Sequence, residues 1–124
     1  MDNQQRDWVD ALDVYSQYFH AHCLHEGSER RAAIVRLTLL KDIEGVQDYQ
    51  ISASFFPFEN EEDFLVANDV IVTRTVLAGL KRRNKKKEAS LLATFRQDID
   101  ELLPQLSGEA VIYWDKPLRQ ARYG

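Results

Sequence analysis

The sequence predicts a single α+β domain in the order α-β-β-β-α-β, with a mostly antiparallel four-stranded sheet and two amphipathic helices on one face. Three observations lead to this fold class. An apolar stripe at helical spacing opens the chain, an alternating hairpin pattern follows, and a second helical stripe precedes the last apolar run. With 124 residues, 44% of them hydrophobic, the chain is long enough to bury one core spanning 1–124.

Residues 5–25 carry the pattern of a first helix. Apolar residues recur at intervals of four, three, four and four, which places them on one face of a helix with 3.6 residues per turn. Gly27 is positioned to end that helix. The stripe is rich in aromatic side chains, as expected for a helix that packs on a sheet: Trp8, Leu12, Tyr15, Phe19 and Cys23.

A β-hairpin is predicted over residues 32–56. The strand at 32–41 would direct Val35, Leu37 and Leu39 into the core, with Arg36 and Thr38 facing away. Residues 42–45 have Asp first and Gly fourth, as in a type I turn. The strand at 46–56 then alternates, with Tyr49, Ile51, Ala53 and Phe55 on one side and Gln50, Ser52 and Ser54 on the other.

The middle of the chain is predicted to form an acidic loop and a third strand. Pro57 ends the hairpin because proline cannot donate to a ladder. Residues 59–63 are mostly acidic, and the branched side chains of 64–77 favour a strand. A helix over 61–67 is the alternative, since acidic residues are favourable in a first turn.

A second helix is expected from about residue 86 to residue 103, ending before Pro104. Its apolar stripe contains Leu91, Leu92, Phe95, Ile99 and Leu102. A last strand follows at 110–114, with Asp115-Lys116-Pro117 as its terminator. Residues 118–124 are predicted to be a loose tail.

Composition favours a cytoplasmic protein that does not enter a membrane. The only cysteine, Cys23, excludes an internal disulfide and fits a reducing compartment. No apolar run approaches the roughly 18 residues that a membrane span requires, and the N-terminus lacks the pattern of a secretory signal.

Charge is distributed unevenly along the chain. The formal net charge is −4, from 16 basic and 20 acidic residues, and residues 81–87 hold six of the basic ones: Lys81, Arg82, Arg83, Lys85, Lys86 and Lys87. Cationic side chains beside a helix N-terminus suit phosphate or another anion. A solvated loop, or one paired with the acidic loop at 59–63, is the alternative. Because the remaining protein is acidic, local contact with a nucleic acid or an acidic protein surface is expected rather than wrapping of a polyanion.

All three histidines and the cysteine fall within six residues: His20, His22, Cys23 and His25. These residue types ligate zinc or copper. On one helix, however, they divide between two faces and cannot close a tetrahedron, and the chain contains no further His or Cys. Packing and helix-dipole contacts are the simpler interpretation, so no metal or cofactor is predicted.

The sequence does not predict an enzyme or point to a particular family. The five glycines are too far apart for a phosphate-binding loop, and no serine has the glycines of a nucleophile elbow around it. Phe55, Phe56 and Phe58 surround Pro57 and are candidates for a partner interface, with capping of the core as the alternative. We therefore expect a small binding or regulatory protein that contacts an anionic partner through residues 81–87. The alternative is a protein-interaction adaptor or chaperone-like homodimer that uses its sheet face or edge.

Overall fold

The computed structural model describes residues 7–66, 69–106, 108–118 and 122–123. They form one α+β domain built on a single antiparallel sheet. Its five main strands have the order β4-β3-β2-β1-β5, and the two-residue β6 pairs with β1. The strands are β1 (Trp8–His25), β2 (Ser28–Asp42), β3 (Gln47–Phe56), β4 (Val70–Leu80), β5 (Val111–Pro117) and β6 (Arg122–Tyr123). The helical segments are the 3₁₀ turn η1 (Glu61–Val66), the helices α1 (Lys85–Ala93) and α2 (Phe95–Leu102), and the 3₁₀ turn η2 (Leu103–Gln105).

The predicted helix at 5–25 is wrong, because Trp8–His25 form the long strand β1, paired along its length with β2, and residues 5 and 6 lie outside the described residues. Its apolar spacing imitated a helix because intervals of four fit one face of a strand as well as one face of a helix, and the one interval of three, from Leu12 to Tyr15, spans the register shift between Asp13 and Tyr15. The second shift, between His20 and Cys23, leaves Phe19, Ala21 and Cys23 buried in the core at a period of two, and Leu12 is exposed rather than part of the core. The observed sheet consequently has five main strands rather than four, and the order begins with strands.

The predicted hairpin is confirmed. β2 and β3 pair from Ala32 opposite Phe56 to Lys41 opposite Gln47. Within the turn, the Gly45 N–H donates to the Asp42 carbonyl at 3.0 Å, and the Asp42 side chain accepts from the N–H groups of the following turn. An additional two-residue turn, with Gly27 at a φ of 77°, joins β1 to β2, so this glycine serves a hairpin rather than a helix end.

The predicted third strand begins too early. Residues 61–66 form η1, close to the alternative helix considered for 61–67, and β4 starts at Val70. The predicted helix at 86–103 is divided at Thr94 into α1 and α2. The α2 helix ends at Leu102 and Pro104 follows within η2, in agreement with the expected effect of proline.

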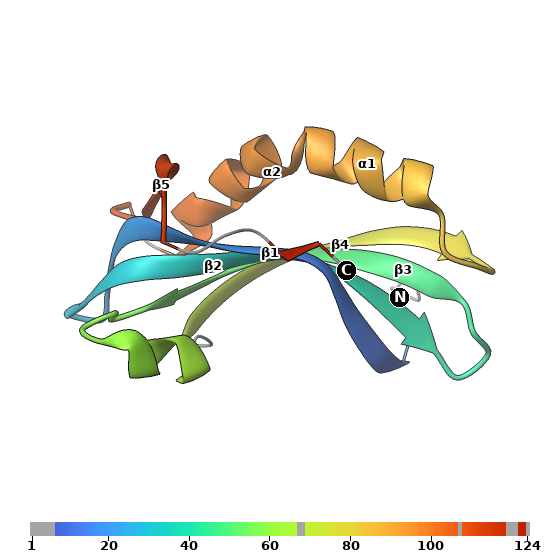
Figure 1. The fold of residues 1–124 in the computed structure, drawn as a ribbon, viewed down its shortest axis with the longest axis horizontal. Helices are drawn as coiled ribbons and strands as arrows, with labels where there is room; N and C mark the ends of the chain where they lie inside the picture. Colours follow the sequence, from blue (N-terminus) through green and yellow to red (C-terminus); the bar gives the residue numbers. More distant parts are fainter. Residues whose placement is uncertain (1–6, 67–68, 107, 119–121, 124) are drawn as a thin grey trace.

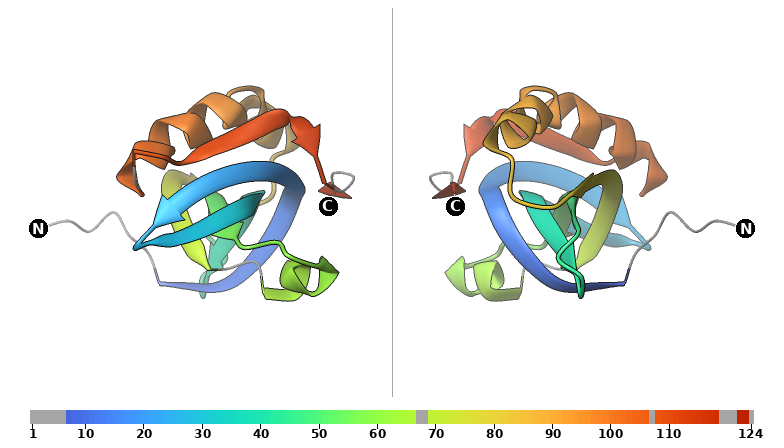
Figure 2. Two further views of the ribbon diagram at one scale, coloured as in Figure 1. Left: turned by 90° about the vertical axis from the view of Figure 1, so that its left-hand side faces the viewer. Right: turned by 90° about the vertical axis from the view of Figure 1, so that its right-hand side faces the viewer.

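The helices cover only one face of the sheet (Figures 1 and 2). α2 inserts Phe95, Ile99 and Leu102 into the main core, against core-facing side chains of the strands that include Leu37 and Ile51. The helices also carry the chain from β4 at one edge to β5 at the opposite edge, where β5 pairs with β1. The core therefore lies between one sheet and one helical layer.

The C-terminal segment is attached to β1 at two points. The Leu118 N–H donates to the Tyr18 carbonyl at 2.9 Å, and β6 pairs with Tyr15 and Ser16. β5 continues through the Asp115–Pro117 terminator that the sequence suggested. None of the helices in the described part of the chain has the length and apolar character needed to cross a membrane.

The edge between β3 and β4 depends on a buried carboxylate. Asp48 is fully buried, and its Oδ1 accepts the backbone N–H groups of Ala78 and Gly79 at 2.8 and 2.9 Å. Its Oδ2 accepts the indole N–H of Trp8 at 3.0 Å. These bonds lie where the pairing of β3 and β4 shifts register, between Gln47 and Tyr49. Asp48 thus replaces ladder bonds that the bulge removes.

We expect Asp48→Ala to lower the free energy of unfolding by about 1.5–3 kcal/mol, because it removes a buried charged acceptor of three partly buried donors. Urea denaturation followed by tryptophan fluorescence measures the change. Asp10→Ala is the control, since the exposed Asp10 bonds only to the neighbouring Ala11 N–H, and its effect should stay within about 0.5 kcal/mol. Equal losses in the two variants would contradict this role for Asp48.

Candidate functional site

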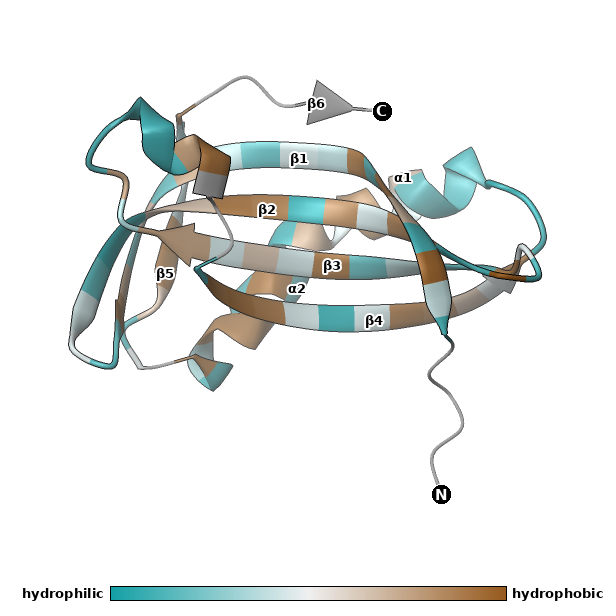
Figure 3. Cartoon of the chain, turned by 90° about the horizontal axis from the view of Figure 1, so that it is seen from below, coloured by the Kyte–Doolittle hydropathy of each residue, from teal (hydrophilic) through white to brown (hydrophobic). Residues whose placement is uncertain are grey.

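The sheet face opposite the helices is open over most of its area (Figure 3). Of the described segments, η1 covers part of it at one end, where Phe58, Phe64 and Leu118 pack on a small apolar cluster of Ala32, Ile34 and Phe56. Strand register places polar residues in rows across the rest of this face. Arg36 lies opposite Ser52, which lies opposite Thr73, and Thr38 lies opposite Gln50. The open face is therefore mainly polar and made by four neighbouring strands.

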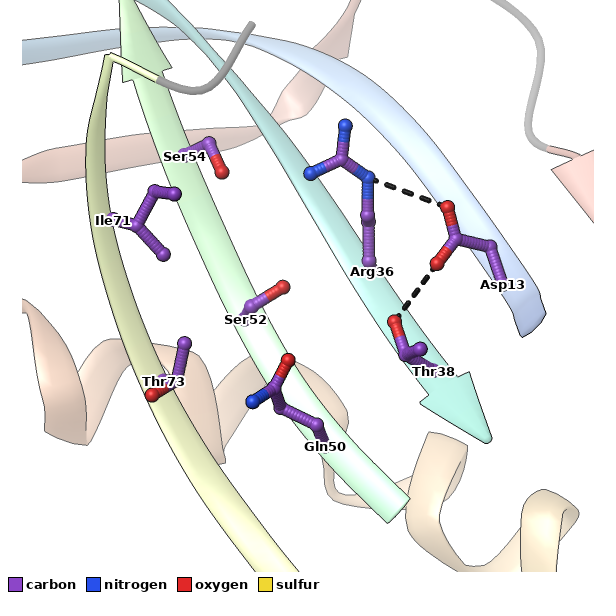
Figure 4. A pocket seen from close by; sticks show the side chains of 8 residues that line it. All are labelled: Asp13, Arg36, Thr38, Gln50, Ser52, Ser54, Ile71 and Thr73. Atoms are coloured by element: carbon purple, nitrogen blue, oxygen red, sulfur yellow. Dashed lines mark hydrogen bonds and ion pairs between the residues drawn. The ribbon is translucent and has the colours of Figure 1, made fainter. Parts of the chain in front are cut away.

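These polar side chains surround a hollow of about 320 Å³ (Figure 4). At one side the Asp13 carboxylate joins two residues of β2: Oδ1 accepts from the Thr38 hydroxyl at 2.8 Å, and Oδ2 lies 3.5 Å from Arg36 Nε. The other side is formed by β3 and β4. We call this site the open-face hollow; its lining is Asp13, Arg36, Thr38, Gln50, Ser52, Ser54, Ile71 and Thr73.

The floor of the open-face hollow contains hydroxyl groups withdrawn from solvent. Ser52 and Thr38 are buried, and Ser54 is fully buried with no hydrogen-bond partner for its Oγ. Alternation in the sequence had correctly assigned these residues to the face away from the core. Asp13 was missed because β1 was interpreted as a helix, so its pairing opposite Thr38 could not be anticipated.

The six basic residues of 81–87 do not form one uniform patch. Lys81, Arg82, Lys85 and Lys86 are exposed and Lys87 is half-buried, whereas Arg83 turns toward the protein and binds Glu88. We call Lys81, Arg82, Lys85, Lys86 and Lys87 the cationic corner. Among the described residues none of these five forms an ion pair with a carboxylate. The acidic turn η1 lies at the opposite end of the sheet and under its other face, so it does not neutralise them (Figures 1 and 3).

The backbone of the cationic corner is held by two side chains. Asn84 caps α1, accepting the Lys87 N–H at 3.0 Å. Arg83 donates from Nε and Nη2 to the two oxygens of Glu88 at 2.8 and 3.0 Å. Because Asn84 already uses one of the free amides, the helix start offers an anion fewer backbone donors than the sequence suggested. The cationic side chains therefore provide most of the attraction between this segment and an anion.

Glu88 is fully buried and also accepts the Tyr49 hydroxyl at 2.8 Å. Burial would raise the pKa of its carboxyl, but hydrogen bonds from Arg83 and Tyr49, with the positive charges of Arg83 and Lys85, hold the pKa below its ordinary value. Burial and the bond to Glu88 raise the pKa of Tyr49 well above its usual value. Glu88 is thus ionised at neutral pH and Tyr49 is its neutral donor.

The three phenylalanines proposed for a partner interface are separated by the sheet. Phe55 is fully buried in the main core, and Phe56 is fully buried in the cluster on the other face. Phe58 is half-buried and packs with Phe56 and Phe64. The ring contacts match the alternative in which these residues cap a core, and Phe58 alone retains partial exposure.

The histidine and cysteine cluster is also divided by strand geometry. Cys23 is buried in the main core, while His20 is exposed. The His22 Nε2 lies 3.5 Å from Glu29, and the His25 Nε2 lies 3.9 Å from Glu26. Within the described residues, no three His, Cys, Asp or Glu side chains are arranged to hold a metal ion.

Comparison of the chain with protein-family models, with curated proteins and with solved structures found no match.

The Glu88 network predicts a specific acid sensitivity. A carboxyl whose pKa is lowered on folding stabilises the fold above its ordinary pKa of about 4.3, and this contribution is lost as the pH falls through the lowered value. We expect Glu88→Gln to cost about 1.5–3 kcal/mol at pH 7 and to flatten the decline in stability at acidic pH. Urea denaturation from neutral to acidic pH measures both effects.

Glu101→Gln is the matched control for this experiment. Glu101 accepts from Arg74 at 3.1 Å but its side chain is half exposed, so its loss should cost at most about 1 kcal/mol. If Glu88→Gln kept the wild-type acid dependence, ionisation of Glu88 would not be what stabilises this end of the helical layer.

Proposed function

We propose that this protein is a small non-catalytic binding protein that contacts an anionic partner, with nucleic acid the leading candidate, through the cationic corner. One observation carries the proposal. Five cationic side chains lie within one short segment, and none of them forms an ion pair with a described carboxylate. Unpaired cations at short spacing create a local positive potential that attracts phosphates or carboxylates.

The attachment of this turn supports the same proposal. Arg83 donates hydrogen bonds to Glu88, and Asn84 accepts one from the first turn of α1. These bonds hold the backbone between β4 and α1, while the neighbouring Lys85 and Lys86 are exposed. A fixed backbone reduces the entropy lost when the cations meet a partner. Because the protein outside this segment is acidic, the contact would be short and strongly dependent on salt.

The proposal predicts that Lys85→Gln, Lys86→Gln and Lys87→Gln together reduce binding of a short single-stranded oligonucleotide. Each phosphate contact of a single strand contributes about 0.7 to the slope of log K against log salt, so losing three contacts should reduce the slope by about 2. Fluorescence anisotropy at several salt concentrations measures the slope. Arg83 stays unchanged in this variant because it holds Glu88.

The control variant removes three exposed cations elsewhere: Arg31→Gln, Lys41→Gln and Lys116→Gln. It has the same net charge as the test variant but keeps the cationic corner, so its slope should remain close to that of the wild type. Equal slopes for the two variants, or no binding by the wild type at low salt, would exclude the proposal. A polyglutamate probe in parallel distinguishes an acidic protein partner from nucleic acid.

We also propose self-association through the outer edge of β4 as a second candidate function. Among the described residues only β3 pairs with β4, so the other side of this 11-residue strand presents unpaired backbone groups. The strand contains neither lysine nor proline, the usual protections of an edge. Its one charge, Arg74, is bound to Asp98 and Glu101 of α2 at 2.9 and 3.1 Å.

A second copy of the chain fits this edge by antiparallel pairing about a two-fold axis at Thr75. The axis would place the two Thr75 residues opposite each other and Arg74 opposite Val76 of the second copy, so like charges would not meet directly. Two exposed apolar residues of β4, Ile71 and Leu77, would become partly covered. The result would be one sheet continuous across two protomers.

Thr75→Lys tests this pairing by placing two positive charges opposite each other at the axis. We expect the wild type to remain dimeric at about 1 M salt, where charges are screened beyond ~3 Å. The dissociation constant of the variant dimer should be at least about tenfold higher than that of the wild type. Sedimentation equilibrium measures both. Ile43→Lys, at an exposed turn outside β4, should leave the dimer unchanged. A monomeric wild type would overturn this second candidate.

A further inference from the structure

The open-face hollow lies on the other side of the sheet from the helices, and neither proposed function uses it as a ligand site. Five of its eight lining residues are uncharged groups that can both donate and accept hydrogen bonds: Thr38, Gln50, Ser52, Ser54 and Thr73. They come from three adjacent strands and converge on one space (Figure 4). Groups of this kind match a ligand whose own polar groups are hydroxyls.

The charges at the rim of the hollow are already balanced. Asp13 and Arg36 carry opposite charges and face each other, and the second oxygen of Asp13 is bonded to Thr38. A charged ligand would have to compete with one partner of this pair, in which the Arg36 side chain is mostly buried and the Asp13 side chain is half exposed. An uncharged ligand leaves the pair intact and can bond to its outer surface.

Ser54 supplies an independent observation. It is fully buried, it lines the hollow, and its Oγ has no hydrogen-bond partner. A buried hydroxyl without a partner destabilises the fold, and a ligand that bonds to it removes that cost. In the sheet Ser54 lies between Ile34 and Ile71, so a polar atom of a ligand that bonded to it would have apolar surface on both sides.

We propose that the open-face hollow binds a small, uncharged, hydroxyl-rich molecule of the sugar or cyclitol class. The ligand hydroxyls bond to Gln50, Ser52 and Ser54, and its C–H groups pack against the exposed side chain of Ile71. The volume of about 320 Å³ is at the lower end of the range for ligand pockets, about 300–1,000 Å³, and it accommodates a single ring.

The test is an NMR titration of the full chain with glucose and myo-inositol, using acetate, glycine and cyclohexanol as comparison probes. We expect saturable shifts of the Ser52 and Ser54 amides with at least one of the two hydroxyl-rich probes. Cyclohexanol, with a single hydroxyl, should bind more weakly because it leaves the polar lining unpaired. Saturation by acetate or glycine alone, or by none of the probes, would overturn the proposal.

Two serine variants make the assignment specific. Ser54→Ala removes an unpaired hydroxyl and should leave the fold intact, while affinity for the hydroxyl-rich probe falls about 3- to 10-fold, the value of one lost hydrogen bond. Ser90→Ala removes an exposed hydroxyl of α1 and should leave affinity unchanged. Equal affinity in the wild type and Ser54→Ala would contradict the site.

The variant with glutamine at positions 85–87 separates this proposal from the nucleic-acid proposal. Its probe affinity should match that of the wild type, because the hollow and the cationic corner lie on different sides of the sheet. If the probe instead shifted only amides of residues 81–87, binding would belong to the cationic corner and the hollow would be excluded.

Discussion

The buried carboxylate of Glu88 joins three parts of the molecule that the rest of the structure needs in fixed positions. It accepts hydrogen bonds from Tyr49 in the centre of the sheet and from Arg83 in the basic segment, and it belongs to the first turn of α1. An ionised carboxylate is tolerated there because its partners compensate the loss of solvation. The start of the helical layer and the turn carrying the cations are thereby fastened to the same point.

Because the helices pack on one face of the sheet, the opposite face is left largely uncovered. Most buried apolar side chains of the strands lie in the main core, and the alternate residues form a mainly polar surface that carries the open-face hollow, apart from the small cluster around Phe56. The cationic corner lies at the end of the helical layer, outside that surface (Figures 1 and 3). Two chemically different surfaces, one positively charged and one mainly neutral and polar, are therefore separated by the thickness of the sheet.

The sequence was sufficient to predict the structure where local sequence patterns and tertiary packing favour the same conformation. Alternation correctly divided β2 and β3 between the core and the open face, and Pro104 limited α2. Prediction failed for β1, because intervals of four fit a strand face as well as a helix and a register shift falls within the one interval of three, from Leu12 to Tyr15; the abundance of Val, Tyr and Phe in that segment is the sign that favours a strand. The role of Arg83 could not be predicted, because a bond to Glu88 beneath a helix depends on tertiary placement.

The most direct test of the account is a map of where a polyanion touches the protein. Amide shifts are measured by NMR while a short single-stranded oligonucleotide is added at low and at moderate salt. The account predicts shifts centred on residues 81–87 that weaken as salt increases, with the amides of the open-face hollow unaffected. Shifts centred on the hollow, or an absence of saturable shifts at low salt, would contradict it.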